Sequence, residues 1–467
     1  MLSENGQKVF EARYAARDEQ GETCESFEQA VDRLAKTAAA HEKDPSHWEK
    51  KFRQAISSLF FVPSTPIWAN IGKTDRPWQP GACFVLDVED SLQSMYQTLT
   101  ETALVFKSGG GVGYNFSKIR PQGSLVHSTK GRASGVVELI KLYDASSNMV
   151  MQGGVRRGAS MGILNIDHPE ILNFINSKLN EGMANFNISV GITDAFMEAV
   201  AENRDWDLVF GGQVQSTYKA RELWQAIAQA AYVCGDPGLV FLDRIQRDNP
   251  IPGNFLNCTN PCGEQPLSPG ESCLLGSINL ALMVDEKGRL KKDLLIDTVQ
   301  TAVRFLDNLI DLAEYPLPKI AEATRASRKI GLGFTGLHDA LIKSGLAYDS
   351  ETGRQKAGEI MALIQHTAHP TSEKLGEDKG VFPLWEKSIF YPEKLRRNAA
   401  CITIAPTGSV TALAGCEGYG IEPIFAVAYS TFTNVAGVFA VFFSLFQNAC
   451  QEAGVSQFAL QLISCRG

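Results

Sequence analysis

The sequence lacks the long apolar segments that insertion into a membrane requires. Its most hydrophobic run, residues 435–446, is too short to span a bilayer, and we interpret it as a buried segment. The opening residues, MLSENGQKVFEARY, have no apolar core of the kind that a secretory signal contains. Basic residues are also scarce, since 44 Lys and Arg against 52 Asp and Glu give a net charge of −8. These absences predict a cytoplasmic protein with no membrane contact and no nonspecific nucleic-acid surface.

Paired metal-binding cysteines are missing as well. The ten cysteines include no Cys-x-x-Cys pair, and Cys258 and Cys262 are separated by three residues with no histidine nearby. A closed zinc site with four ligands is therefore not expected. Ten irregularly spaced cysteines in a cytosolic chain are more typical of functional thiols than of a disulfide framework.

Helical and strand-like patterns alternate along the chain, with no repeat and no flexible linker. We expect a helical N-terminal region over residues 1–62 and an α/β body, a barrel in form, over residues 63–467. Apolar residues at helical spacing predict helices at 27–38, 92–106, 136–151, 171–175 and 299–313. Asp167 and Glu170 are expected to cap the helix at 171–175. A short buried strand is predicted at 401–405.

The segment Asn260-Pro-Cys-Gly-Glu264 concentrates reactive groups in a few residues. Proline at 261 disfavours a helix here, and alternate side chains of an extended segment share one face. Asn260, Cys262 and Glu264 would then project an amide, a thiol and a carboxylate in the same direction. An ordinary turn with a buried cysteine is the alternative, because cysteine is often simply buried.

Three glycine-containing segments are candidates for phosphate contact. Residues 109–113 (GGGVG) do not fit a phosphate-loop pattern, and the end of a helix explains them equally well. The segment 152–158, with Arg156 and Arg157, is either a surface loop or a loop that reorders around a nucleotide. Residues 406–409 (PTGS) would either hold a phosphate with their N–H and hydroxyl groups or act as a plain helix cap.

Taken together, seven segments resemble one family. In chain order they are PSTP (63–66), GAC (81–83), FKSGGGVGYNFSKIRPQG, QGGVRRGASMGILNIDHPEI, NPCGEQPL with ESCLLGSINL, IGLGFTGLHDAL and IAPTGSVTALAGCEGYGIEPIF. Over residues 10 to 435 the chain is similar to ribonucleotide reductases, and most similar to their adenosylcobalamin-dependent class II. The resemblance implies a ten-stranded α/β barrel with Cys262 on a finger loop through its centre.

The resemblance also implies roles for the reactive residues. Cys262 would be the thiyl-radical cysteine that removes the 3′ hydrogen of the ribose, Glu264 the general base on the 3′ hydroxyl, and Asn260 a hydrogen-bonding partner of the sugar. Cys83 and Cys273 would deliver two electrons and become a disulfide. A carboxylate beside a sugar hydroxyl suits proton transfer, and two neighbouring thiols suit two-electron reduction.

Substrate, effector and cofactor contacts are implied in the same way. The substrate would be a ribonucleoside di- or triphosphate, held by Ser64, Thr65, Thr407, Gly408 and Ser409. At the substrate-contacting position 82, alanine stands where many relatives place a hydroxyl residue, so one hydrogen bond to the substrate is expected to be absent.

Gln152 and Arg156 would relay the identity of a deoxynucleotide or ATP effector bound at a homodimer interface near residues 120–131. The cofactor would be adenosylcobalamin, with no residue identified as its ligand and no protein-bound metal site. A thioredoxin-like protein or another dithiol would be the reductant.

The resemblance fades after Phe425, and three alternatives follow from this. We expect a shortened barrel without its last elements and without the cysteine-pair tail that re-reduces the site. The chain would then be an enzyme in its own right, one half of a split enzyme with a separate C-terminal fragment, or a nonenzymatic nucleotide-binding relative. A class I large subunit is disfavoured because no tyrosine relay follows Tyr429.

Overall fold

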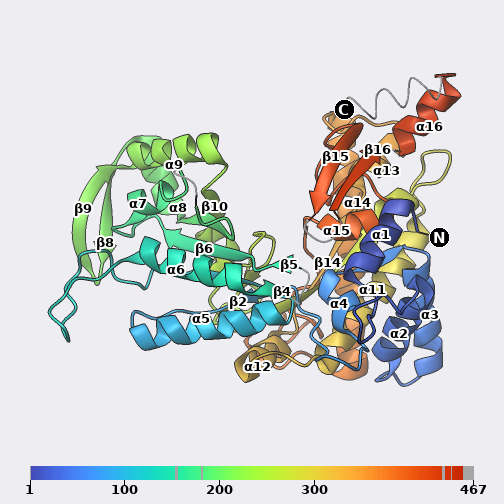
Figure 1. The fold of residues 1–467 in the computed structure, drawn as a ribbon, viewed down its shortest axis with the longest axis horizontal. Helices are drawn as coiled ribbons and strands as arrows, with labels where there is room; N and C mark the ends of the chain where they lie inside the picture. The colour runs from blue at the N-terminus through green and yellow to red at the C-terminus, as the bar shows by residue number, and fades with distance from the viewer. Residues whose placement is uncertain (1, 153–155, 180–181, 434–436, 443, 456–467) are drawn as a thin grey trace.

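The computed structural model describes residues 2–152, 156–179, 182–433, 437–442 and 444–455. The chain forms a mixed α/β fold drawn out along one axis (Figure 1). One end carries α5 to α10 and the β8–β9 ribbon, and the other end carries the N-terminal helices together with α11, α14 and α15. A sheet joins the two ends, and the candidate site lies against it.

The helices have the following bounds: α1 Glu4–Arg13, α2 Phe27–Ala39, α3 Pro45–Ser57, α4 Thr65–Asn70, α5 Leu92–Lys107, α6 Val136–Met149, α7 Ile171–Ile175, α8 Asp194–Glu202, α9 Ala220–Cys234, α10 Leu242–Arg247, α11 Lys292–Leu312, α12 Pro318–Ser327, α13 Leu337–Lys343, α14 Glu351–Lys379, α15 Gly408–Ala414 and α16 Ser444–Glu452. Sequence-encoded caps set several of these starts. For example, Ser26 and Gln29 form a reciprocal capping box at the start of α2.

The strands are β1 Phe61–Pro63, β2 Cys83–Val85, β3 Gly111–Asn115, β4 Met151–Gln152, β5 Arg156–Arg157, β6 Ser160–Asn165, β7 Phe186–Ile192, β8 Asp205–Phe210, β9 Gln213–Lys219, β10 Gly238–Phe241, β11 Cys258–Thr259, β12 Pro266–Leu267, β13 Ser272–Asn279, β14 Ile330–Thr335, β15 Ala428–Thr433 and β16 Gly437–Phe442. Most residues of β3, β6, β7, β13 and β14 are buried, as expected for strands covered on both faces.

The main sheet contains two groups of parallel strands that meet in an antiparallel pair, and β1 at its edge also runs antiparallel to β13. In the described residues it has eight strands, in the order β1-β13-β2-β3-β6-β7-β10, with β14 also paired to β13. Strands β2, β3, β6, β7 and β10 run parallel to one another, and β13 and β14 form the second parallel group. Strand β13 runs antiparallel to β2, so the two groups meet there.

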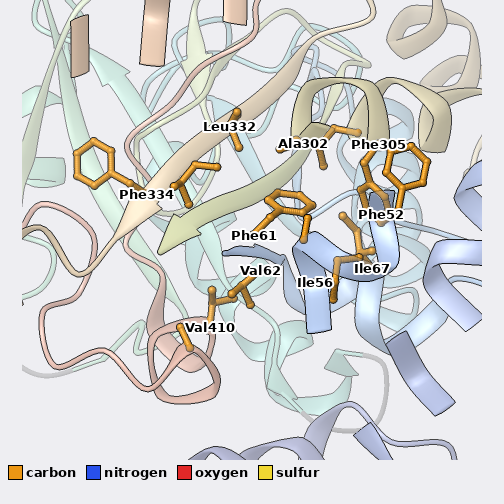
Figure 2. Packing of buried hydrophobic residues seen from close by; sticks show 14 of the residues in the cluster. Phe52, Ile56, Phe61, Val62, Ile67, Ala302, Phe305, Leu332, Phe334 and Val410 are labelled. Carbon is orange, nitrogen blue, oxygen red and sulfur yellow. The ribbon is translucent and has the colours of Figure 1, made fainter. Parts of the chain in front are cut away.

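The N-terminal helices are joined to the sheet by a shared aromatic core. The Phe305 ring of α11 lies 5.3 Å from the Phe52 ring of α3 and 5.5 Å from the Phe61 ring of β1, measured between centroids. Figure 2 shows these rings together, with Val410 of α15 beside Val62 of β1. All three rings are fully buried. Because burial of a large apolar side chain contributes about 1.5–3 kcal/mol, this core holds α3 firmly against the strands.

Most of the predicted helices are confirmed, with small differences at their ends. Helices α2, α5, α6, α7 and α11 lie where the apolar spacing placed them. The predicted cap of α7 is wrong, because Glu170 accepts a hydrogen bond from the Val136 backbone N–H at 2.7 Å and so caps α6 instead. The start of α6 has only Gly135 before it, which has no side chain to cap the helix.

Two strand-like predictions have a different outcome. The segment at 401–405 is not a full strand: it forms a single parallel bridge between Ile402 and Leu332. Part of the apolar run 435–446 forms β16, which pairs with β15. The burial of this run lies outside the described residues except at Phe446, which is half-buried. Among the helices that the structure describes, none is long and apolar enough to cross a membrane.

Candidate active site

The segment with Cys262 forms the tip of a short β-hairpin. Cys258 pairs with Leu267 and Thr259 with Pro266, and the residues between them make the turn. The Gly263 N–H donates to the Asn260 carbonyl at 3.0 Å, and Gly263 has φ of 89°, a value that favours glycine. The prediction of an extended segment is therefore wrong. A tight turn, rather than strand alternation, places the side chains of this hairpin, which we call the finger hairpin (258–267).

Glycines of the neighbouring strand β3 let the finger hairpin lie directly on the sheet. A Cβ atom on Gly113 would lie 1.8 Å from the Thr259 carbonyl oxygen, and one on Gly111 would lie 2.7 Å from Cγ of Pro261. Only glycine allows the two backbones to approach this closely. The GGGVG segment (109–113) thus follows the end of α5, and its β3 part forms a surface on which the finger hairpin packs.

Polar contacts from several elements orient the hairpin tip. The Asn187 side chain donates to the Pro261 carbonyl at 2.8 Å, and the Thr403 hydroxyl donates to the Glu264 carbonyl at 3.1 Å. Within the turn, the Gln265 N–H donates to the Asn260 side-chain oxygen at 3.0 Å. These contacts leave the Asn260 amide nitrogen and the Glu264 carboxylate directed toward β2.

Asn260, Glu264 and Cys83 form a connected polar group. The Asn260 amide donates to the Glu264 carboxylate at 2.7 Å and to the Cys83 sulfur at 3.1 Å. The Cys83 thiol in turn donates to the other carboxylate oxygen of Glu264 at 3.7 Å. The pKa of Cys83 is raised well above its ordinary value, mainly by burial and secondly by the charge of the nearby Glu264 carboxylate. Cys83 is consequently a protonated thiol at neutral pH, with a hydrogen atom to donate.

Cys83 and Cys273 face each other across the junction of the two strand groups. They are direct partners in the antiparallel pairing of β2 with β13. Directly opposed residues of such a pair have Cα atoms about 4.5–5.5 Å apart, which lies within the range that a disulfide spans. Both side chains are buried, and both are free thiols. Burial, followed by the charge of Glu264, also raises the pKa of Cys273.

A cavity of about 330 Å³ opens beside these groups. It is lined by the predicted catalytic residues Asn260, Cys262 and Glu264 and by Cys83, whereas Cys273, the cross-strand partner of Cys83, is not among the lining residues. Cys262 is exposed at the turn, so its sulfur is accessible from solvent as well as from the cavity.

The cavity wall is also rich in hydroxyl groups. All six residues predicted to contact the substrate line the cavity, namely Ser64, Thr65, Ala82, Thr407, Gly408 and Ser409. The Thr65 and Ser409 hydroxyl oxygens lie 3.1 Å apart. The Ser64 hydroxyl is buried with no hydrogen-bond partner. An anion with several oxygen acceptors would satisfy such a wall.

Thr407 contributes its backbone rather than its hydroxyl to this wall. Its side chain is engaged by Thr335, Thr411 and the Gly420 N–H at 3.2, 2.8 and 2.7 Å. Thr407 has φ of 60° and precedes α15 without a side-chain cap. The Thr407 side chain therefore does not cap α15, and the helix-cap alternative for residues 406–409 is wrong for this side chain.

Gln152 and Arg156 are described by their backbone alone. They pair with each other in the two-stranded ribbon β4–β5, whose connecting residues 153–155 lie outside the described part of the chain. The ribbon joins α6 to Ala159, which does line the cavity. Its position next to the cavity agrees with a relay role, which stays a prediction.

One residue of the wall, and a second that contacts it from behind the surface, come from a part of the sequence that offered no signal. Arg13, at the end of α1, lines the cavity, and Tyr14 donates a hydrogen bond to the Ser409 hydroxyl at 2.9 Å. Both lie in the N-terminal helical region, far in sequence from the glycine-rich motifs. Only the packing of α1 on α15 brings them here, and no spacing rule predicts that packing.

The described residues contain no group of three or more His, Cys, Asp or Glu side chains that could hold a metal ion. Cys258, Cys262 and Cys273, which were considered as zinc ligands, are therefore not part of any such group among the described residues. A corrin would bring its own nitrogen ligands for cobalt and needs mainly an open approach to the reacting sulfur. The exposed turn at Cys262 and Gly263 provides that approach, and no described residue is assigned as a ligand of the cofactor.

Two family models match the chain. The one described as ribonucleotide reductase, all-alpha domain, covers residues 1–76, and the one described as ribonucleotide reductase, barrel domain, covers residues 81–395. The barrel match includes the finger hairpin, both strands of the cysteine pair, and β14.

Several curated relatives are similar over most of the chain. A vitamin B12-dependent ribonucleoside-diphosphate reductase of Mycobacterium tuberculosis is 45% identical over 432 residues, which is 90% of this chain and 62% of the relative. One of Thermoplasma acidophilum is 43% identical over 434 residues, 92% of this chain and 56% of the relative. A vitamin B12-dependent ribonucleotide reductase of Streptomyces avermitilis is 30% identical, covering 86% and 50%. The chain thus spans about half to six-tenths of their length.

Proposed function

The chain belongs to the ribonucleotide reductase family. From this premise we propose that it reduces ribonucleotides to 2′-deoxyribonucleotides and so supplies DNA precursors. The proposed chemistry is that of class II, in which adenosylcobalamin initiates a thiyl radical. One observation carries the proposal: Cys262, Glu264, Asn260 and Cys83 line a single cavity, and Cys273 is the direct cross-strand partner of Cys83. The names of the B12-dependent relatives support the choice of class.

Cys262 and Glu264 are suited to activating the ribose. In the proposed reaction the Cys262 sulfur, as a thiyl radical, takes the hydrogen atom from C3′ and returns it at the end, so that it is not consumed. Glu264 accepts the proton of the 3′ hydroxyl, since its carboxylate lies at the cavity wall within one turn of Cys262. Asn260 holds that carboxylate at 2.7 Å and keeps it aimed into the cavity.

The cross-strand thiols supply the two electrons of the reduction. The 2′ oxygen leaves as water, C2′ gains a hydrogen, and the two thiols lose two hydrogen atoms and form one disulfide. Cys83 lines the cavity and Cys273 does not, so Cys83 is the thiol that meets the substrate. Their opposed position in β2 and β13 is one at which the Cα separation falls within the range that a disulfide spans.

The distribution of polar groups orients the substrate. The sugar would face Cys262 and Glu264, and the di- or triphosphate would face the hydroxyl-rich wall of Ser64, Thr65 and Ser409. The unpartnered Ser64 hydroxyl is a donor available to a phosphate oxygen. Ala82 contributes no hydrogen bond from its side chain.

When bound, adenosylcobalamin supplies the radical chemistry by homolysis of its cobalt–carbon bond.

A homodimer and a bound effector are part of the same proposal. Helices α5 and α6 carry large apolar side chains that are exposed in the single chain: Leu92, Tyr96, Leu104, Leu142 and Met149. Such a patch is typical of an interface between proteins. The β4–β5 ribbon with Gln152 and Arg156 lies between this face and Ala159 of the cavity wall, where a deoxynucleotide or ATP effector could influence the choice of base.

The reductant and the location follow from the state of the cysteines. Every cysteine that the structure describes is a free thiol. A buried dithiol that must be regenerated after each turnover calls for a thioredoxin-like protein or a small dithiol, and a reducing compartment such as the cytoplasm maintains both.

The proposal is tested by assaying the full-length protein with adenosylcobalamin, cytidine diphosphate, a deoxynucleotide effector and dithiothreitol. We expect deoxycytidine diphosphate from the wild type and a loss of at least about a thousandfold in Cys262→Ser, since a hydroxyl cannot replace the thiol as a hydrogen-atom carrier. Cys234→Ser, at an exposed cysteine outside the cavity, is the matched control and should keep full activity. No product from the wild type, or undiminished product from Cys262→Ser, would contradict the proposal.

A further inference from the structure

The cavity has a single source of positive charge among the described residues that line it, and this charge lies on the N-terminal helix α1. Arg13 is the one Lys or Arg of the described wall, and Glu264 is its one carboxylate. Glu264 belongs to the cysteine end of the cavity, through its contacts with Asn260 and Cys83. The wall therefore carries one group of each sign, and the negative one lies beside Cys83 and Asn260.

Tyr14 fixes the position of Arg13 relative to the hydroxyl-rich wall. Its hydroxyl donates to Ser409 at 2.9 Å and lies 3.3 Å from the Thr65 oxygen, so the three hydroxyls form a closed triangle with the 3.1 Å contact between Thr65 and Ser409. Because Tyr14 donates to Ser409, the Ser409 hydroxyl keeps its own hydrogen to donate elsewhere. Arg13, the residue just before Tyr14, lines the cavity from the same helix end.

The end of α1 is anchored from several sides. The Tyr14 ring is fully buried and stacks on Trp68, with centroids 6.0 Å apart and an interplanar angle of 23°. The buried Lys73 ammonium donates to the carbonyls of Tyr14 and Ala15 at 2.9 and 3.3 Å. These contacts fix the backbone that carries Arg13, so that little conformational entropy is lost when a ligand binds.

Helix α1 also packs closely on the helix that follows the phosphate turn. A Cβ on Gly6 would lie 3.2 Å from the Ala412 carbonyl of α15, so the absence of a side chain lets the two helices approach. The N-terminal helix and the turn at 407–409 are thus one packed unit. A ligand that binds the turn will stabilise the attached helix as well.

We propose that the end of α1 forms the phosphate-recognition wall of the cavity, with Arg13 contacting the phosphate and Tyr14 acting as a positioning residue for Ser409 and Thr65. The inference rests on the proposed function, because it requires a nucleotide in this cavity. It adds that the N-terminal helix α1 recognises the phosphates of the substrate and so distinguishes a nucleotide from a nucleoside. A guanidinium pairs well with phosphate oxygens, which the hydroxyls alone only partly satisfy.

The test compares the binding of cytidine diphosphate and cytidine to the full-length protein by calorimetry, without effector. Arg13→Gln should weaken the diphosphate about tenfold or more and leave cytidine unchanged, because the lost interaction is a charge-assisted one. Arg13→Lys should recover part of the affinity. Lys8→Gln removes the same charge from the exposed side of α1, outside the cavity, and should change neither ligand.

Tyr14→Phe keeps the ring against Trp68 and removes only the hydroxyl. We expect about threefold to tenfold weaker diphosphate binding, as for the loss of one hydrogen bond, with cytidine again unaffected. Hydrogen exchange supplies a second readout: cytidine diphosphate should slow exchange over residues 4–14 in the wild type and not in Arg13→Gln.

The outcomes separate this inference from the proposed function. If the wild type binds neither ligand, the proposed function and the inference both fall. If the wild type binds the diphosphate and Arg13→Gln binds it equally well, with no difference in exchange over α1, only the inference is overturned. If Arg13→Gln weakens cytidine as much as the diphosphate, Arg13 has a structural role and the inference is likewise wrong.

Discussion

At the scale of single residues, the structure shows which atoms of the predicted site can act. The family resemblance implied a phosphate contact for both Ser64 and Thr407, yet of the two only Ser64 has a buried hydroxyl without a hydrogen-bond partner. The Thr407 hydroxyl is occupied by Thr335, Thr411 and the Gly420 N–H. The residue type could be read from the sequence, but the direction of the side chain depends on neighbours that are distant in the chain.

Glu42 is another residue whose environment comes entirely from the fold. It follows α2, and its carboxylate accepts hydrogen bonds from Arg304 and Asn308 of α11 and Lys379 of α14, all at 2.8–3.0 Å. Burial acts to raise the pKa of Glu42, but the bonds from Arg304, Lys379 and Asn308 outweigh it and lower the pKa to about 2. Glu42 thereby fastens the N-terminal helices to the body that carries the cavity.

We predict that Glu42→Gln lowers the free energy of unfolding at pH 7 by about 3 kcal/mol, because it leaves two cations beside a neutral amide. A carboxyl with a lowered folded-state pKa stabilises the protein above its unfolded pKa, near 4.5, and the contribution is lost as the pH falls from there toward 2. The difference between wild type and variant should therefore shrink between pH 5 and pH 2 in urea titrations. Glu19→Gln, in an exposed loop, is the control, and a pH-independent difference would contradict the argument.

At the scale of elements, glycines rather than reactive residues decide where the finger hairpin lies. Gly111 and Gly113 of β3 make room for the hairpin on one side, and Gly331 of β14 makes room for Gln265 on the other, where a Cβ would lie 2.6 Å from its amide nitrogen. Close packing of this kind transmits small displacements directly to neighbouring groups. The position of Cys262 thus depends on strands that contribute no reactive group.

We predict that Gly113→Ala displaces the finger hairpin and lowers turnover by about a hundredfold, since a shift of about 1 Å at a reacting group has an effect of that size. The stability loss should be about 1–3 kcal/mol, as for other overpacked sites. Turnover and urea unfolding are the measurements. Gly358→Ala, where a Cβ would meet nothing within 4 Å, is the control and should keep full activity. Normal turnover in Gly113→Ala would show that the close contact is not required.

At the scale of the whole molecule, the decisive feature is the junction between the two parallel groups of strands. Strands β2 and β13 meet there in antiparallel pairing, and the pairing register sets Cys83 opposite Cys273. The finger hairpin lies over the same junction, and α1, α4 and α15 close the cavity from the N-terminal side. The site therefore needs the helical region, both strand groups and the hairpin to be folded together.

The sequence predicted local features well and tertiary ones only through family resemblance. Helices α2, α5 and α11 followed from apolar spacing, because a periodicity of 3.6 residues is a local property. The opposed position of Cys83 and Cys273 could not be derived from spacing, since the register of β13 against β2 is set by the rest of the sheet. Arg13 and Tyr14 were missed for the same reason: their neighbours Thr65 and Ser409 are brought to them by packing.

The most direct test of the account is a single turnover of the prereduced full-length protein with adenosylcobalamin, cytidine diphosphate and effector, in the absence of any external reductant. Deoxycytidine diphosphate is counted per chain, and the cysteine peptides are identified by mass spectrometry after the remaining thiols are alkylated. We predict one product molecule per chain, accompanied by one new disulfide that joins Cys83 to Cys273, with Cys262 recovered as a thiol. Product formed while Cys83 and Cys273 both remain alkylatable thiols would contradict the central claim.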